Sequence, residues 1–305
     1  MPLSLAANPT MPLRHLSQLF LLAAIWGASF LFLRVAVPTL GPVWLIAGRI
    51  GFAALFLGAV AALLRQGLPL GEWRHFLVLG LLNTALPFLA YGFAARQLNA
   101  SLMSILNATA PIWGAIIMAS LQRRLPARSV MLGLLLGMLG VAVLVGFDRV
   151  SSQPGAAWAI GACLGATLCY GLASSYAKLK ASHLAPFKSA HGSMWGATLL
   201  VLPLLTVSSP AASPTPLVWG AVLALAILCT GVAYLLYFRL VRDIGAASTL
   251  TVTFLIPIFG VLWGALLLGE HIGSNTLAGG LIILLGTALV TGFNPLARLR
   301  AAQPS

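Results

Sequence analysis

Long apolar runs separated by short polar segments repeat along the whole chain. Ten runs are roughly 20 residues or longer, the length at which an α-helix crosses a hydrocarbon core about 30 Å thick. Because such long runs cannot be amphipathic surface helices, the pattern predicts an all-α polytopic membrane protein. The ten predicted transmembrane helices are 15–37, 42–64, 73–95, 98–121, 128–147, 156–178, 186–207, 216–239, 244–269 and 275–294.

Composition agrees with a chain whose solvent is the lipid bilayer. Hydrophobic residues make up 60% and charged residues 7%, whereas a soluble domain has about 25% charged residues. A net charge of +13 can indicate nucleic-acid binding, but the basic residues are scattered between apolar runs, so no nucleic-acid partner is expected. Cys163, Cys169 and Cys229 lie inside apolar runs without metal-ligand spacing. We therefore expect no cofactor and no metal.

The distribution of lysine and arginine predicts the orientation. With a cytoplasmic N-terminus, the cytoplasmic segments carry most of the 17 basic residues, as the positive-inside rule requires. The opposite side has Arg34, Arg96 and Arg149, and Arg49 lies inside a helix. We expect a bacterial-type inner membrane with both termini in the cytoplasm. The cytoplasmic set is Arg14, Arg65, Arg74, Arg123, Arg124, Arg128, Lys178, Lys180, Lys188, Arg239, Arg242, Arg298 and Arg300.

The two halves of the chain repeat each other. An offset of 146 residues, without a gap, pairs Trp73, Thr84, Tyr91 and Pro111 with Trp219, Thr230, Tyr237 and Pro257. Near the start of each half the offset is 144. Each half holds five helices, and an odd number forces the second half to enter the membrane from the other side. The prediction is two inverted five-helix repeats, an architecture of secondary transporters. The expected divisions are a tail 1–13, repeats 14–147 and 156–294, a linker 148–155 and a tail 295–305.

Several of these segments resemble a known family. They are Trp26-Gly27-Ala28-Ser29-Phe30, Pro42 with Arg49, and the stretch from Gly245 through Pro257 to Glu270. Over nearly the whole chain the sequence resembles EamA-type members of the drug/metabolite transporter superfamily, and most of all the YddG-type amino-acid exporter branch. The resemblance implies the ten-helix fold and the export of small solutes. One departure is Gln122-Arg123-Arg124, which stands where first repeats commonly carry a Glu. Glu270 therefore has no symmetric partner.

Ionisable residues bear on the energetics of transport. The four acidic residues, Glu72, Asp148, Asp243 and Glu270, all lie in predicted loops or at helix ends. Since proton-driven transporters usually carry an intramembrane acid or His, we favour facilitated flux. His191 is the competing candidate for proton coupling, with a packed, proton-inert His as the alternative. Arg49 is a candidate contact for a substrate carboxylate, although a structural arginine is the slightly favoured interpretation.

Polar and aromatic residues within the spans predict a central cavity between the repeats, because polar atoms facing lipid are costly. Interhelical hydrogen bonding and ordinary aromatic packing are the alternatives. The candidate substrate-binding residues are Trp26, Asn83, Tyr91, Asn107, Tyr170, His191, Trp195, Thr230 and Tyr234. The helix kinks that accompany gating are expected at Pro87, Pro111 and Pro257. The glycine-rich helices 128–147 and 275–294 are expected to be closely packed scaffold.

Four alternative functions differ in how well the sequence supports them. The favoured one is export of neutral or aromatic amino acids by alternating access, with a small metabolite as the partner and a monomer as the expected state. The second is export of other metabolites or drugs, with proton coupling as an option. A membrane enzyme is disfavoured because no HExxH, Ser/Lys pair or Asp pair lies in the spans. A non-transport assembly protein is the remaining alternative.

Overall fold

The computed structural model describes residues 12–123, 128–146 and 154–291, and in these ranges the chain is helical without strands. Arg124, Asp148, Arg149, Arg298 and Arg300 lie outside the described residues, so their predicted sides of the membrane are not described. The same is true of the tail 295–305 and of most of the tail 1–13 and the linker 148–155.

The first repeat crosses the bundle five times. The long helix α1 (Leu13–Leu63) makes two crossings, because its backbone turns at Gly41, where φ is 69° and an L side chain would be strained. Pro38 and Pro42 flank this turn. The third crossing begins with a short η1 (Leu70–Glu72) and continues through α2 (Trp73–Gly80), the π-helical turn η2 (Leu81–Ala85) and α3 (Leu86–Ala94). The fourth crossing consists of α4 (Ala100–Asn107) and α5 (Ala110–Leu121). The fifth is α6 (Arg128–Gly146).

The second repeat follows the same plan. Its crossings are α7 (Ala156–Lys180); α8 (Pro186–Val201) with η3 (Leu202–Val207); α9 (Pro216–Leu223) with the π-helical η4 (Ala224–Val232) and α10 (Ala233–Ile244); α11 (Ala246–Thr249) with α12 (Val252–Leu268); and α13 (Ser274–Thr291). Six of the described helical segments are long and apolar enough to cross a membrane, and three shorter apolar helices accompany them. The predicted fold of ten helices in two inverted repeats is confirmed.

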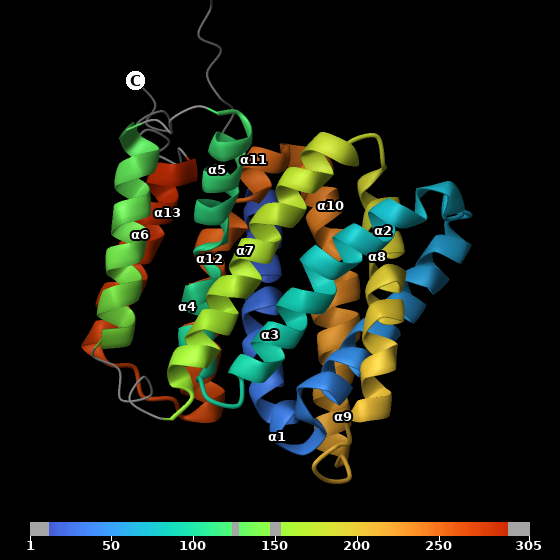
Figure 1. Ribbon diagram of the computed structural model, residues 1–305, viewed down its shortest axis with the longest axis horizontal. Helices are drawn as coiled ribbons and strands as arrows, with labels where there is room; N and C mark the ends of the chain where they lie inside the picture. Colours follow the sequence, from blue (N-terminus) through green and yellow to red (C-terminus); the bar gives the residue numbers. More distant parts are fainter. Residues whose placement is uncertain (1–11, 124–127, 147–153, 292–305) are drawn as a thin grey trace, which may run out of the picture.

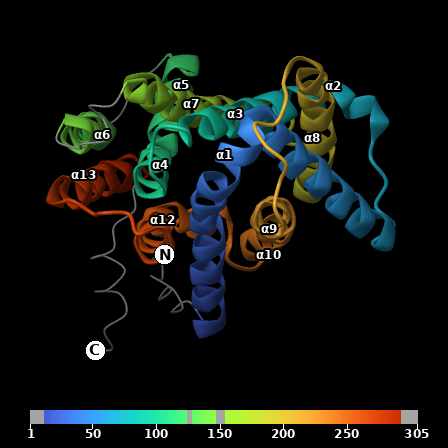
Figure 2. The ribbon, with the colours of Figure 1, turned by 90° about the horizontal axis from the view of Figure 1, so that it is seen from below.

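Helices α6 and α13 lie side by side at one edge of the molecule (Figures 1 and 2). Glycines allow their backbones to touch: a Cβ added to Gly140 would lie 2.9 Å from the carbonyl oxygen of Gly279, and one on Gly286 would lie 2.7 Å from that of Gly133. The expected close packing of these two helices is confirmed, and their scaffold role stays a prediction.

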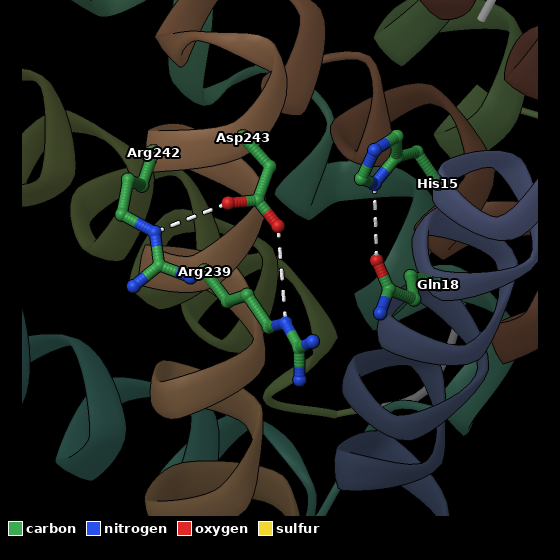
Figure 3. Close-up of polar contacts among 5 residues, drawn as sticks. All are labelled: His15, Gln18, Arg239, Arg242 and Asp243. Carbon is green, nitrogen blue, oxygen red and sulfur yellow. Dashed lines mark hydrogen bonds and ion pairs between the residues drawn. The ribbon is translucent and has the colours of Figure 1, made fainter. Parts of the chain in front are cut away.

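Acidic side chains of the described residues stay at the ends of the helices. Asp243, near the end of α10, contacts two arginines: Arg242 Nε lies 3.1 Å from one carboxylate oxygen and Arg239 Nε 3.8 Å from the other (Figure 3). The neighbouring first turn of α1 carries His15, which pairs with Gln18. Such partly exposed ion pairs are worth little to stability. Asp243 therefore lies at a helix end and not in the middle of the bundle.

Candidate substrate site

Arg49 lies in the second half of α1 and is 6% exposed. Its Nε donates a hydrogen bond to Thr230 Oγ1 over 3.2 Å, and its Cζ atom lies 3.7 Å above the centre of the Phe88 ring. In the described part of the chain no carboxylate forms an ion pair with it. A buried guanidinium without a counter-ion is costly, and here its contacts are the Thr230 hydroxyl and the Phe88 ring.

Thr230 is positioned by a local distortion of its helix. It sits in the π-helical segment η4, and its hydroxyl donates to the carbonyl of Leu225, five residues earlier, over 2.8 Å. The same oxygen accepts the bond from Arg49. Segments of π-helix often occur at functional sites because they shift side chains relative to a regular helix. Here the shift places a hydroxyl from α9–α10 against the charge on α1.

Three more predicted site residues gather around this guanidinium. Tyr170 of α7 and Tyr234 of α10 are close enough to interact with it electrostatically. The Asn83 side chain, from the π-helical turn η2, lies close to the Tyr234 hydroxyl. We call Arg49, Asn83, Tyr170, Thr230 and Tyr234 the Arg49 cluster. It draws on both repeats, as a site between inverted repeats must.

Tyr91 and Asn107 form a second polar pair beside the cluster. The Tyr91 hydroxyl donates to Asn107 Oδ1 over 3.0 Å, and the Tyr91 ring meets Phe30 edge-on at 5.4 Å between centres. Tyr91 is also within electrostatic range of Tyr170. Because Asn107 is the last residue of α4, this pair ties α3 to the point where the fourth crossing breaks.

Trp26 joins the aromatic side of the region from α1. Its ring packs against Tyr237 with 5.6 Å between centres, and Tyr237 in turn lies within electrostatic range of Tyr234. The next residue, Gly27, leaves no room for a side chain: a Cβ there would lie 2.9 Å from the backbone nitrogen of Gly260 on α12. The close approach of α1 and α12 at Gly27 fixes the position of the adjacent Trp26 along the bundle.

His191 and Trp195 lie elsewhere. The Trp195 indole N–H donates to His191 Nε2 over 2.9 Å, and both rings face Gly58. Gly58 is nine residues beyond Arg49 on the same helix, about 14 Å along its axis at 1.5 Å per residue. His191 instead lines a hollow of about 320 Å³ with Gly58, Ala61, Arg65 and Gln66. The structure thus separates this pair from the Arg49 cluster.

The three predicted kink prolines occupy different settings. Pro87 is the second residue of α3, which follows the π-helical turn η2, and Pro111 is the second residue of α5, which follows the break between α4 and α5. Pro257 lies inside the continuous helix α12, and the break in that crossing comes earlier, between α11 and α12. The repeat-related prolines therefore do not mark repeat-related breaks.

Several polar side chains that were not among the predicted site residues lie at the break in the fourth crossing. The Thr287 hydroxyl donates to the carbonyl oxygen of Ala108 over 2.9 Å, and the hydroxyls of Thr109 and Thr167 lie 3.1 Å apart. Phe88 under the guanidinium was missed too. The one available signal was spacing, since Phe88 follows Thr84 by one helical turn.

Ten crossings, two inverted repeats and a buried polar cluster between them define a multi-pass membrane transporter. The family comparison agrees: residues 15–146 and 157–292 both match the model of the EamA-like transporter family. The chain belongs to that family.

Relatives of this chain carry transporter names without a substrate. The uncharacterized transporter YoaV of Bacillus subtilis is 24% identical over 274 residues, covering 88% of this chain and 93% of YoaV. An uncharacterized transporter of Archaeoglobus fulgidus is 27% identical over 291 residues, with the same two coverages. A solved crystal structure with a TM-score of 0.64 spans 96% of this chain and all of its own, at 17% identity. That likeness supports the fold alone.

Proposed function

We propose that this transporter exports small amphipathic carboxylates, with neutral and aromatic amino acids as the preferred class. Transport would proceed by alternating access across a bacterial-type inner membrane, with both termini in the cytoplasm. The observation that carries the proposal is the Arg49 guanidinium, which is buried and has no acidic partner among the described residues.

A substrate carboxylate would supply the missing partner. Guanidinium and carboxylate form two parallel charge-assisted hydrogen bonds, which are among the strongest polar contacts in proteins. Nε of Arg49 is used by Thr230, so the terminal nitrogens remain for the substrate. The phenol rings of Tyr170 and Tyr234 provide walls for an apolar or aromatic side chain, and the Asn83 amide adds a polar group. This set favours a solute with one carboxylate and one apolar part.

Facilitated flux is the proposed energetics. Glu72, Asp243 and Glu270 lie at helix ends, away from the Arg49 cluster. The bond that Trp195 donates to His191 requires an unprotonated Nε2, so the neutral imidazole suits this contact. Proton coupling through His191 is the competing mechanism, and a rate that depends strictly on a pH gradient would establish it in place of facilitated flux.

The test is flux in proteoliposomes with labelled phenylalanine and with phenylalanine amide, in which a neutral carboxamide replaces the carboxylate. Arg49→Gln should lower phenylalanine flux about tenfold or more, since losing a charged hydrogen bond costs about 1.5–3 kcal/mol. The same variant should change carboxamide flux much less. Arg96→Gln is the matched control, because this substitution removes the same charge from an exposed position. Equal losses for both solutes, or for both variants, would contradict carboxylate binding at Arg49.

Export of other metabolites or drugs is the second candidate. It is favoured if every amino acid moves equally through empty and protein-containing vesicles while another amphipathic solute moves through the protein. A non-transport assembly role would require no protein-dependent flux for any solute.

A further inference from the structure

We propose that Glu72, His75 and His183 form a binding site for a divalent transition-metal ion of the zinc class. One ligand atom from each residue lies within 4.8 Å of the other two. His75 Nε2 is 3.5 Å from one oxygen of Glu72, and His183 Nε2 is 3.3 Å from the other. Two imidazoles and one carboxylate are a common set of protein ligands for zinc.

The spacing of these atoms fits a tetrahedral ion. Ligand atoms about 2.0–2.1 Å from zinc at the tetrahedral angle lie about 3.4 Å from each other. Each histidine nitrogen is already close to this distance from Glu72, although the two distances run to different carboxylate oxygens, so a single glutamate ligand atom matches one of them. Bringing the ligand nitrogens of His75 and His183 to this distance needs a movement of His183. Its side chain is 53% exposed and lies in the turn between α7 and α8. A water would complete the fourth position.

Tyr176 orients His75 for this purpose. His75 Nδ1 lies 2.7 Å from the Tyr176 hydroxyl, and the two rings are 5.7 Å apart. If Nδ1 carries the proton and donates it to Tyr176, Nε2 keeps the lone pair that a metal needs. Metal-binding histidines almost always use the second ring nitrogen in such a contact. Tyr176 is therefore assigned as a positioning residue, not a ligand.

The site has a structural setting of its own. Glu72 and His75 share the first turn of the third crossing, in the first repeat, whereas His183 and Tyr176 belong to the second repeat. A bound ion would clamp the two repeats together at that end of the bundle. The nearest basic neighbour in sequence, Arg74, turns its guanidinium toward the Trp73 ring at 5.5 Å. The sequence did not suggest this site because its histidines are far apart along the chain.

The test is calorimetric titration of the purified full-length protein, with its affinity tag removed, with zinc alone. Wild type should saturate at one ion per chain and should melt at a higher temperature with zinc. His183→Ala and Glu72→Gln should weaken binding more than tenfold. His271→Ala is the matched control, because it removes an exposed histidine on another loop and should bind as wild type does.

Tyr176→Phe separates positioning from folding. It should weaken zinc binding about 10- to 100-fold, as the loss of an orienting contact typically does, while leaving one site per chain and the zinc-free melting temperature unchanged. Absence of saturable binding, or equal binding by wild type and His183→Ala, would overturn the proposal. So would a zinc response that disappears only in His271→Ala. If zinc binding is not saturable, Glu72, His75 and His183 form an ion-pair cluster and no metal site.

Discussion

Replacing Glu270 by glutamine should loosen the join between the end of α12 and the start of α4. The Glu270 carboxylate accepts hydrogen bonds from the backbone nitrogens of Ala100 and Ser101, at 2.6 and 3.0 Å, and from the Ser101 hydroxyl at 2.6 Å. Asn99 caps the same helix by accepting from the nitrogen of Leu102 at 2.8 Å. Together the two side chains satisfy three backbone N–H groups that a helix start leaves free.

The magnitude follows from these three contacts. A hydrogen bond to a charged group is worth about 1.5–3 kcal/mol, and a negative charge at a helix N-terminus adds about 0.3–1 kcal/mol. Glutamine keeps one acceptor oxygen but turns an NH2 group toward donors. We therefore expect a net loss of about 2–4 kcal/mol in the free energy of unfolding. For a chain of this size that corresponds to a fall of about 5 °C or more in the melting midpoint.

The assay is thermal unfolding of the purified protein in detergent at a fixed scan rate, because such unfolding is rarely reversible. Asp243→Asn is the matched acid-to-amide control, since Asp243 pairs only with partly exposed arginines, and its midpoint should stay at the wild-type value. Combining Glu270→Gln with Ser101→Ala should cost less than the sum of the two, because both remove the same bond. A Glu270→Gln midpoint equal to that of Asp243→Asn would refute the capping role.

Three further predictions concern buried groups. Thr230→Val removes the acceptor of the buried guanidinium and should lower the melting midpoint, whereas Thr84→Val removes a hydroxyl that has no partner among the described residues and should leave it unchanged or raise it. Gly140→Ala should cost about 1–3 kcal/mol in thermal unfolding, since its Cβ would press on the opposite helix, while Gly161→Ala meets open space and should be neutral or slightly stabilising. Tyr91→Phe loses one neutral hydrogen bond, so its midpoint should fall by the equivalent of about 1 kcal/mol, and proteoliposome flux should fall with it.

The crossings were predictable because lipid imposes both length and periodicity. The predicted span 156–178 is α7 (Ala156–Lys180), and the predicted 186–207 ends where η3 ends. The internal repeat, with five helices in each half, predicted that the second half has the opposite orientation in the membrane. What escaped the sequence is the backbone irregularity inside crossings: the π-helical segments η2 and η4 and the break after α4. Polar residues such as Asn83 and Thr84 of η2 and Thr230 of η4 occur in regular helices as well, so they do not by themselves mark a π-helical turn.

Contacts across long stretches of sequence were equally hidden. Glu270 was correctly placed at a helix end, but its partners Ala100 and Ser101 lie in the other repeat. Nothing in a single sequence pairs such positions, because the pairing depends on how the two repeats dock. The predicted site residues show the same limit. Helix periodicity pointed Tyr234 inward, but it could not tell that His191 packs against Gly58, about 14 Å along α1 from Arg49.

Both repeats contain a π-helical segment that carries a threonine, but the two threonines have different surroundings. Thr84 and Thr230 are repeat mates, and each lies in a π-helical segment of its own repeat. Thr230, in the second repeat, accepts a hydrogen bond from Arg49 of the first repeat. The repeat mate of Arg49 is Ser193 of the second repeat, whose hydroxyl instead donates to the carbonyl of Ala190 on its own helix. The Thr84 hydroxyl has no hydrogen-bond partner within the described part of the chain. Symmetry therefore supplies two equivalent positions for a polar contact, and the single arginine makes only one of them charged. A carboxylate would bind off the pseudo-twofold axis, beside α9–α10, so inward and outward states need not hold it equally well.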